Sequence, residues 1–96
     1  MISVNTIRQK LADQPDRLRE YNVAQLWLFG SAARQEATIR DLDFLVEFST
    51  APGLSDYMNL KFFLEDTFGM PVDLHSHKTC PERFYERIRN DLKNVA

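Results

Sequence analysis

The sequence predicts an α/β (α+β) fold in which a small mixed β-sheet of about three or four strands is packed with helices. Three observations predict it. Short apolar runs at residues 24–29, 42–48 and 72–75 have the length of buried strands. Segments with apolar residues at helical spacing separate these runs, and clusters rich in glycine and proline mark their ends. The expected order of elements is αβαβαβα.

Two helices are expected at the start of the chain. The first has apolar residues at helical spacing in Val4, Ile7 and Leu11. It should run to about Ala12, and Pro15 suits the first turn of a second short helix with Leu18 on its inner face.

The first two strands flank a turn. Residues 24–29 form the first strand, which the pair Gly30-Ser31 breaks before the helix-compatible segment 32–36. A loop near residues 37–40 then leads into the second strand at 42–48. The order is therefore strand, tight turn, short helix, strand.

A longer helix is expected from about Ser55 to Phe68. Its apolar stripe consists of Tyr57, Leu60, Leu64 and Phe68, with Phe63 beside it. Gly69 is placed to end this helix in a left-handed cap, and Pro71 discourages continuation before the third strand at 72–75.

The chain should close with a last helix. Thr79 and Glu82 have the spacing of a capping box. The apolar stripe of this helix would consist of Phe84, Ile88, Leu92 and Val95. Helices should then cover one face of the sheet, and the other face or its edge should stay open for a nucleotide.

Two aspartates one residue apart indicate a metal site. Asp41 and Asp43 stand at the entrance of the second strand, where residues i and i+2 project from the same face. Magnesium takes oxygen ligands, often one or two carboxylates together with substrate phosphates. The pair therefore suits Mg²⁺ and a nucleoside triphosphate. The alternative is that both are ordinary polar residues on a half-exposed strand.

The pair Gly30-Ser31 suits a phosphate site. Glycine allows close approach of the backbone to a ligand, serine offers a hydroxyl and an N–H, and the amides that begin a helix favour anions. The alternative is an ordinary turn with a serine cap. Because the turn and the aspartates follow one another closely, the phosphate-and-metal interpretation is favoured over two unrelated features.

Other polar and aromatic residues give weaker signals. Arg34 could contact phosphate or form a surface ion pair, and for Arg40 the surface ion pair is favoured. His75 and His77 form a poor zinc signal, although His75 is near enough to Asp73 to touch the site. A core role is favoured for the large aromatic side chains Trp27, Phe29, Phe44, Phe62, Phe63 and Phe68.

Composition narrows the class of protein. A chain of 96 residues buries somewhat over 60% of its unfolded surface, which is roughly enough for a single domain. That domain should comprise residues 1–96. Because no second domain is expected, recognition of a substrate should be shared with a partner. The 12 basic and 14 acidic residues give a charge of −2 without a basic block, which argues against direct nucleic-acid binding as the main task.

The remaining composition favours a cytoplasmic location. The single cysteine, Cys80, excludes an internal disulfide and a thiolate metal cluster. No apolar run is long enough to span a bilayer, and the N-terminus lacks a secretion signal. No membrane association is expected.

The motifs resemble those of a known superfamily. The run 28–34, followed by the run 40–46, is similar to the signature of the polymerase β-like nucleotidyltransferases. The short length resembles that of the minimal nucleotidyltransferase (MNT) domain proteins, commonly the antitoxin half of HEPN/MNT toxin–antitoxin pairs. The superfamily has a third carboxylate on a later strand, where Asp73 stands here. This chain has Gln35 and Arg40 where family members often have glycine and serine.

The resemblance implies a nucleotidyltransferase-like fold and an enzyme that uses Mg²⁺ and ATP. The expected catalytic and metal-binding residues are Asp41, Asp43 and Asp73, with Gly30 and Ser31 binding the nucleotide. It further implies transfer of AMP to a hydroxyl, expected to be a tyrosine, of a cognate HEPN ribonuclease toxin, which is thereby neutralised. Two alternatives stay open: a non-catalytic antitoxin that acts by binding alone, and a nucleotidyltransferase that modifies a small molecule or RNA.

Overall fold

A four-stranded mixed sheet forms the centre of the computed structural model, which describes residues 2–96. Its strands are β1 (Val23–Phe29), β2 (Leu42–Phe48), β3 (Val72–Ser76) and β4 (Lys93–Asn94), in the spatial order β3-β2-β1-β4. Strand β1 is antiparallel to β2 and β4, whereas β2 and β3 are parallel. The predicted mixed sheet of three or four strands is confirmed.

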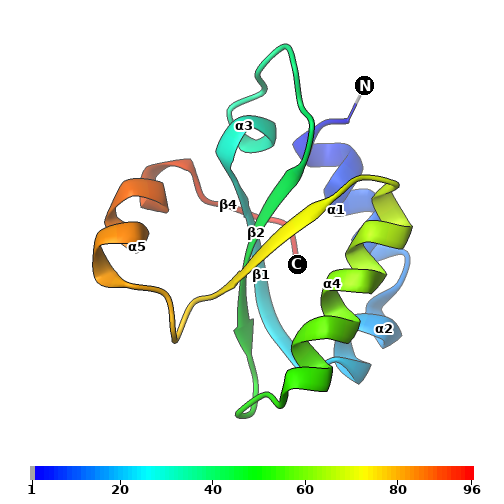
Figure 1. Cartoon of the computed structure of the whole chain (residues 1–96). Coiled ribbons are helices and arrows are strands. Elements are labelled where there is room, and N and C mark those ends of the chain that lie inside the picture. Colours follow the sequence, from blue (N-terminus) through cyan, green and yellow to red (C-terminus); the bar gives the residue numbers. More distant parts are fainter. Residues whose placement is uncertain (1) are drawn as a thin grey trace.

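Helices pack on both sides of this sheet. They are α1 (Val4–Ala12), α2 (Pro15–Glu20), α3 (Gly30–Ala33), α4 (Leu54–Phe68) and α5 (Glu82–Ile88), followed by the 3₁₀ turn η1 (Arg89–Asp91). Helices α1, α2 and α4 lie on one side and α5 on the other, and the one-turn helix α3 stands at the end of β1 (Figure 1). Among the helices of residues 2–96, none combines the length and apolar character that crossing a membrane requires.

The main core lies between the sheet and helices α1 and α4. Alternate residues of β1, β2 and β3 point into it, and each fully buried leucine or phenylalanine contributes about 1.5–3 kcal/mol by leaving water. Its fully buried large side chains include Ile7, Leu11, Leu26, Leu28, Leu42, Phe44, Leu60 and Leu64. The predicted stripes of α1 and α4 are thus confirmed.

The aromatic side chains mostly take the core role predicted for them. Phe29, Phe44 and Phe63 are buried, and Trp27 and Phe68 are partly buried against the apolar clusters. Phe62 is the exception, because 52% of its surface is exposed on the outer side of α4.

A second, smaller cluster lies on the opposite face of the sheet. Phe29 and Leu45 pack there against Ile88 of α5, with Trp27 and Phe84 partly buried beside them. The expectation that helices cover only one face was therefore wrong. Helix α5 closes part of the second face, and the part next to the starts of β2 and β3, where Asp41 and Asp73 are exposed, stays open.

The predicted last helix was wrong in its start and its length. Pro81, not Thr79, precedes the first turn, and no side chain caps it. The helix ends at Ile88, so Leu92 and Val95 leave it and reach the smaller and the main cluster, respectively. The reason is the free edge of β1, which pairs with the segment that forms β4.

Hydrogen bonds fix this final segment in place. The N–H of Val95 donates to the carbonyl of Leu26 (2.8 Å), and the N–H of Leu26 donates to the carbonyl of Ala96 (2.9 Å). Arg8 of α1 donates through Nε to the carbonyl of Asn94 at 2.9 Å. The outer edge of β1 is thereby satisfied by residues that the apolar spacing alone had assigned to a helix.

Side chains satisfy backbone groups on the outer edge of β3. The N–H of Val72 donates to Oε2 of Glu65 at 3.0 Å, and the hydroxyl of Tyr57 donates to the carbonyl of Leu74. Both side chains come from α4. The longest helix thus covers one face of the sheet and also satisfies part of its edge.

The end of α4 offers a direct test of the fold. Gly69 has φ +65°, as its predicted left-handed cap requires, and a Cβ added there would meet nothing within 4 Å. Gly69→Ala should therefore destabilise the protein by backbone strain alone, by about 1 kcal/mol. Thermal unfolding followed by circular dichroism should show a melting temperature lower by roughly 4–8 °C.

Gly53→Ala is the matched control. Gly53 begins the same helix at φ −83°, and the nearest atom to an added Cβ is Oδ2 of Asp56 at 3.9 Å. Because Gly53 is the N-cap of this helix, where glycine is favoured over alanine, the variant should lose roughly 0.5 kcal/mol through the cap and nothing through backbone strain. Equal losses in the two variants would contradict the left-handed cap.

Candidate active site

The register of the sheet sets two of the predicted aspartates side by side. In the parallel pair of β2 and β3, Asp43 lies opposite Asp73, and in the antiparallel pair of β1 and β2 the same Asp43 lies opposite Phe29. Alternation along each strand puts both carboxylates on the face that carries α5. Asp41 precedes β2 by one residue and lies near Asp43, because its charge raises the pKa of that carboxyl.

Gly30 is packed directly against the carboxylate of Asp43. It adopts φ +74°, and a Cβ added to it would overlap Oδ2 of Asp43 and lie 3.1 Å from its Cγ. Only glycine combines this backbone conformation with such a close approach. The glycine therefore brings the turn after β1 into contact with the carboxylate pair.

The turn that follows is shorter than predicted. The expected helical segment at residues 32–36 is instead the single turn Gly30–Ala33, in which Arg34 donates its N–H to the carbonyl of Gly30 at 3.1 Å. Ala32 and Ala33 are buried in the main core. These two small side chains let the turn lie close to the sheet and hold Ser31, which is half-buried, beside Gly30.

Gln35 ends this turn in a left-handed conformation, with φ +57°. Such a conformation normally favours glycine. Here the side-chain amide of Gln35 donates to the carbonyl of Ala32 at 2.7 Å and supports the conformation locally. The chain therefore keeps a left-handed turn at a position where the sequence lacks glycine.

The environment of Asp43 opposes its ionisation. Burial raises the pKa of this carboxyl above its ordinary range, and the charges of Asp41 and Asp73 raise it further. His75 and Arg34 act in the opposite sense but more weakly. Asp43 is therefore close enough to Asp41 and to Asp73 to be repelled by both, and a bound cation would relieve that repulsion.

His75 touches the candidate site, as its distance along the chain from Asp73 suggested. Its Nε2 lies 3.3 Å from Oδ2 of Asp73, whose side chain is 63% exposed. Its ring centroid lies 4.6 Å from that of Phe84 and 5.9 Å from that of Phe29. His75 thus connects the carboxylate of Asp73 to the apolar cluster under α5.

The two arginines singled out in the sequence differ in their contacts. Arg34 pairs through Nε with Glu36 at 2.7 Å and through Nη1 with Asp91 of η1 at 2.8 Å. These hydrogen bonds, the one to Glu36 first, raise the pKa of Arg34. This favours a structural role, tying the α3 turn to the final segment. Arg40 is exposed and takes part in no ion pair within residues 2–96.

The aspartates of the candidate site offer the kind of ligand atoms that magnesium binds, but they do not form a complete cation site by themselves. Within residues 2–96, no three acidic, histidine or cysteine side chains are gathered closely enough to hold a metal. Asp41, Asp43 and Asp73 nevertheless supply the oxygen donors that magnesium prefers, and phosphate oxygens commonly complete such a site. Gly30 packs so closely on Asp43 that no side chain at position 30 would fit between the turn and this carboxylate.

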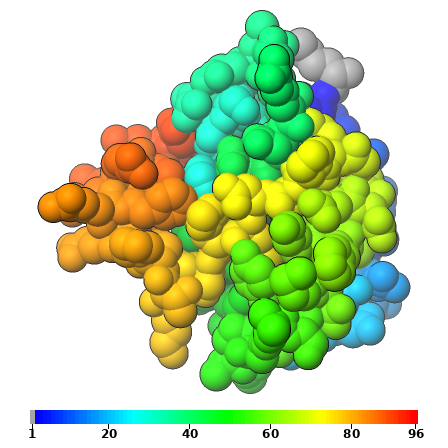
Figure 2. Space-filling model, in the orientation of Figure 1, coloured from blue at the N-terminus to red at the C-terminus, as the bar shows by residue number. Residues whose placement is uncertain are grey.

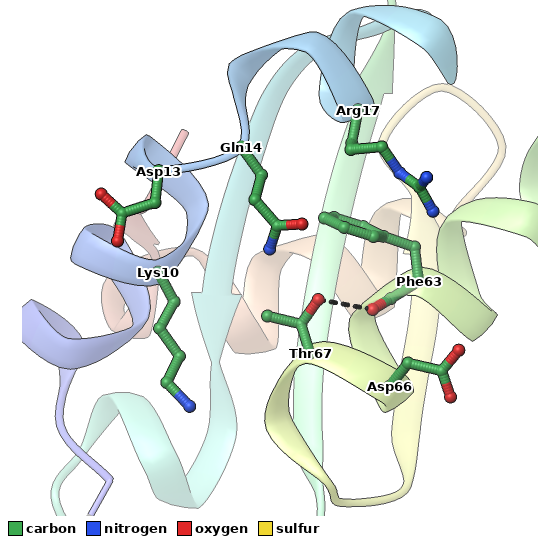
Figure 3. A pocket seen from close by; sticks show the side chains of 7 residues that line it. All are labelled: Lys10, Asp13, Gln14, Arg17, Phe63, Asp66 and Thr67. Atoms are coloured by element: carbon green, nitrogen blue, oxygen red, sulfur yellow. Dashed lines mark hydrogen bonds between the residues drawn. The ribbon is translucent and has the colours of Figure 1, made fainter.

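Another hollow lies away from these residues. It has a volume of about 510 Å³ and lies between α4 and the segment that joins α1 to α2 (Figure 3). Two cations, Lys10 and Arg17, and two carboxylates, Asp13 and Asp66, line it together. This hollow has mixed charge and lies on the side of the sheet that carries α1, α2 and α4. It is therefore separate from the aspartate cluster, which consists of Asp41, Asp43 and Asp73 on the α5 side.

The fold and this cluster agree with a known family. The family model described as polymerase beta nucleotidyltransferase matches residues 6–95. The chain belongs to the polymerase β nucleotidyltransferase family.

Two relatives carry more specific names. A protein of Methanocaldococcus jannaschii, provisionally named a protein adenylyltransferase, is 32% identical over 95 residues, which make up 98% of this chain and 99% of that protein. Protein adenylyltransferase MntA of Thermococcus cleftensis is 36% identical over 76 residues, which make up 77% of each chain.

Solved structures share the fold. A protein described provisionally as a minimal nucleotidyltransferase superposes with a TM-score of 0.77 and 29% identity, covering 96% of this chain and 95% of the other. A toxin–antitoxin structure with AMP-PNP gives 0.74 and 17%, covering 93% and 72%. The complex of a tri-AMPylated Shewanella oneidensis HEPN toxin with an MNT antitoxin gives 0.68 and 16%, covering 94% and 71%. At these lower identities, the last two similarities concern the fold alone.

The raised pKa of Asp43 predicts how stability depends on pH. A carboxyl whose pKa is higher in the folded than in the unfolded state stabilises the fold when protonated, and this contribution is lost as the pH rises through the folded pKa. Asp43→Asn removes the ionising group. The variant should therefore be more stable than the wild type at pH 7 in the absence of divalent cations. Its advantage should shrink as the pH falls through the folded-state pKa of Asp43, because the wild-type carboxyl is then protonated.

Urea unfolding of both proteins between pH 3 and pH 7 measures this difference. Asp16→Asn serves as the control, because Asp16 is 91% exposed on α2 and its one ion pair within residues 2–96 is with Arg19 at 3.6 Å. It should not reproduce the gain. An Asp43→Asn protein that is less stable than the wild type at pH 7 would show that burial and repulsion do not govern this carboxylate.

Proposed function

We propose that this protein acts in the cytoplasm as an antitoxin that transfers AMP from ATP to a tyrosine hydroxyl of a cognate HEPN ribonuclease toxin. The observation that carries the proposal is the register of the sheet, which sets Asp43 beside Asp73 and brings the Gly30 turn to the same level. Two carboxylates and a glycine turn at one place on the sheet are what binding a triphosphate together with magnesium requires.

Each residue has a definite role in this proposal. Gly30 and Ser31 position the outer phosphates of ATP, because the turn leaves no side chain between its backbone and Asp43. Asp41 and Asp43 would hold magnesium, and Asp73 would complete a second magnesium site. Magnesium, when bound, would neutralise phosphate charge and stabilise the attacking and leaving oxygens.

The transfer itself exchanges one phosphorus–oxygen bond for another. The acceptor hydroxyl oxygen bonds to the α-phosphorus in line with the bridging oxygen that leaves, and pyrophosphate departs. Asp73 takes the hydroxyl proton. Its exposed carboxylate can reach an acceptor from outside the chain.

The names of the relatives support the choice of acceptor. Two of them are named protein adenylyltransferases, and a structure of the same fold contains a tri-AMPylated HEPN toxin with an MNT antitoxin. The short chain adds physical support, because the aspartate cluster lies on an open face and no second domain of residues 2–96 encloses it. A protein acceptor would cover that face itself.

Intact mass spectrometry of the HEPN partner tests the proposal. After incubation with this protein, Mg²⁺ and ATP, the partner should gain one or more increments of the mass of AMP. Asp41→Asn/Asp43→Asn should slow the gain by at least about 100-fold, because the charge on the reacting phosphates is no longer compensated.

The matched control is Asp16→Asn/Asp66→Asn, which removes two exposed aspartates on the helical side of the sheet and should transfer at the wild-type rate. The wild type and its Asp41→Asn/Asp43→Asn variant could instead silence the toxin equally well, without any mass increment. That result would indicate an antitoxin that acts by binding alone.

Gly30→Ala tests the contact between the turn and the carboxylate. The new Cβ would displace Asp43, so the variant should lose nearly all AMP transfer, at least about 100-fold. Gly53→Ala, whose added Cβ would make only an ordinary van der Waals contact with Oδ2 of Asp56 at 3.9 Å, should keep the wild-type rate. Fluorescence titration with an ATP analogue should show weakened binding for Gly30→Ala only, and unchanged binding with full transfer would disprove the role of the turn.

A further inference from the structure

The order of the strands defines two sides of the reaction centre. Phe29, Asp43 and Asp73 lie level with one another on β1, β2 and β3, and β2 is in the middle. Gly30 follows Phe29, so the outer phosphates that it positions belong on the β1 side. In-line transfer needs the attacking oxygen opposite the leaving one. The acceptor must therefore approach from the β3 side, over Asp73.

A groove reaches that side through His75, and its wall residue Phe84 also lies 5.8 Å from Phe29 of β1, measured between ring centroids. It has a volume of about 780 Å³ and is lined by His75, Pro81, Arg83, Phe84, Glu86 and Arg87. His75 connects it to the reaction centre, because its Nε2 lies 3.3 Å from Asp73 and its ring lies against Phe84. Figure 2 shows α5, in orange, as a lobe that stands beside the yellow strand β3. The groove thus runs from the third carboxylate along the surface of α5.

The groove combines an apolar wall with excess positive charge. Phe84 and Pro81 provide the apolar part. Arg83 and Arg87 are exposed, stand one helical turn apart, and form no ion pair within residues 2–96, although Glu86 lies between them in the sequence. Two arginines against one glutamate leave a net positive surface beside a strongly negative aspartate cluster.

This charge distribution selects the occupant. An acidic protein segment would be repelled by the three aspartates unless nearby cations compensated for that repulsion. Arg83 and Arg87 can do so, because arginine pairs well with carboxylates. The triphosphate of ATP is a poorer candidate for this groove, because its outer phosphates belong at Gly30, on the far side of β2. An aromatic side chain, in turn, packs well on phenylalanine and proline.

We propose that this groove seats the acceptor segment of the partner protein, with the ring of the target tyrosine against Phe84 and Pro81 and an acidic residue near it in sequence on Arg83 and Arg87. The identity of the reaction rests on the proposed function. The groove adds a role for α5, which would determine the choice of acceptor. The residues of α5 are remote in sequence from the aspartates and the glycine turn.

Steady-state transfer to the HEPN protein tests this assignment. Arg83→Glu and Arg87→Glu, singly and together, should raise KM for the acceptor, by at least about tenfold for the pair, because each reversal repels the acidic segment. The affinity for ATP should change by less than about twofold. Arg19→Glu is the matched control, since Arg19 is an exposed arginine on the helical side of the sheet, and it should leave KM unchanged.

Three results would overturn the assignment. A parallel loss of ATP affinity would place the nucleotide in the groove. A fall in kcat at constant KM would assign the arginines to the chemical step. An unchanged KM in the double variant would leave the groove without a role in docking.

A second measurement keeps the groove testable if the HEPN protein is not modified at all, which would overturn the proposed function. A tyrosine peptide flanked by glutamates is titrated into ¹⁵N-labelled wild-type protein, and a lysine-flanked peptide is titrated in parallel. The acidic peptide should shift the amide signals of His75, Arg83 and Phe84, and the basic peptide should not. Equal shifts, or shifts confined to other elements, would overturn the docking surface independently of the reaction.

Discussion

The candidate site depends on backbone pairing that holds like charges together. Asp43 and Asp73 are neighbours because β2 and β3 pair in one parallel register, and Gly30 reaches Asp43 because β1 pairs with β2 in one antiparallel register. Burial raises the pKa of Asp43 above its ordinary range, and repulsion by the charges of Asp41 and Asp73 raises it further. The apolar residues on the opposite face of the same strands hold the register against this repulsion. Moving either strand by one residue would turn its aspartate into the main core.

Local patterns in the sequence predicted most of the elements, and non-local contacts account for the exceptions. The left-handed cap at Gly69 and the bounds of β2 follow from residues within the segments themselves. Leu92 and Val95 continue the helical spacing of α5, yet the free edge of β1 draws them into β4, and no local pattern reveals that an edge needs a partner. At the site, the sequence singled out Asp41, Asp43, Asp73 and the Gly30 turn. The register of the sheet brings Asp43, Asp73 and the turn together, and the chemical roles of all four stay predictions. It could not reveal that Arg34 is tied to Asp91, 57 residues away.

Helix α5 gives the open face of the sheet its asymmetry. Ile88 closes the apolar part of that face over Phe29 and Leu45, while the aspartate end stays accessible. The same helix carries Phe84 and the two arginines outward beside β3. One short element thus completes a core and shapes the surface next to the carboxylates. Because its contacts with the sheet are few and local, substitutions on its outer side can change the surface while the register of the aspartates is kept.

The outer edge of β3 has a consequence for how copies of this protein behave in a crowded solution. An unpaired strand at the rim of a sheet is a template onto which another chain can add a strand. Glu65 occupies the N–H of Val72, and Tyr57 occupies the carbonyl of Leu74, so two of the groups that an incoming strand would need are already bonded. No further strand pairs with this rim within residues 2–96. Two side chains from α4 instead oppose sheet-to-sheet polymerisation and help keep the protein dispersed.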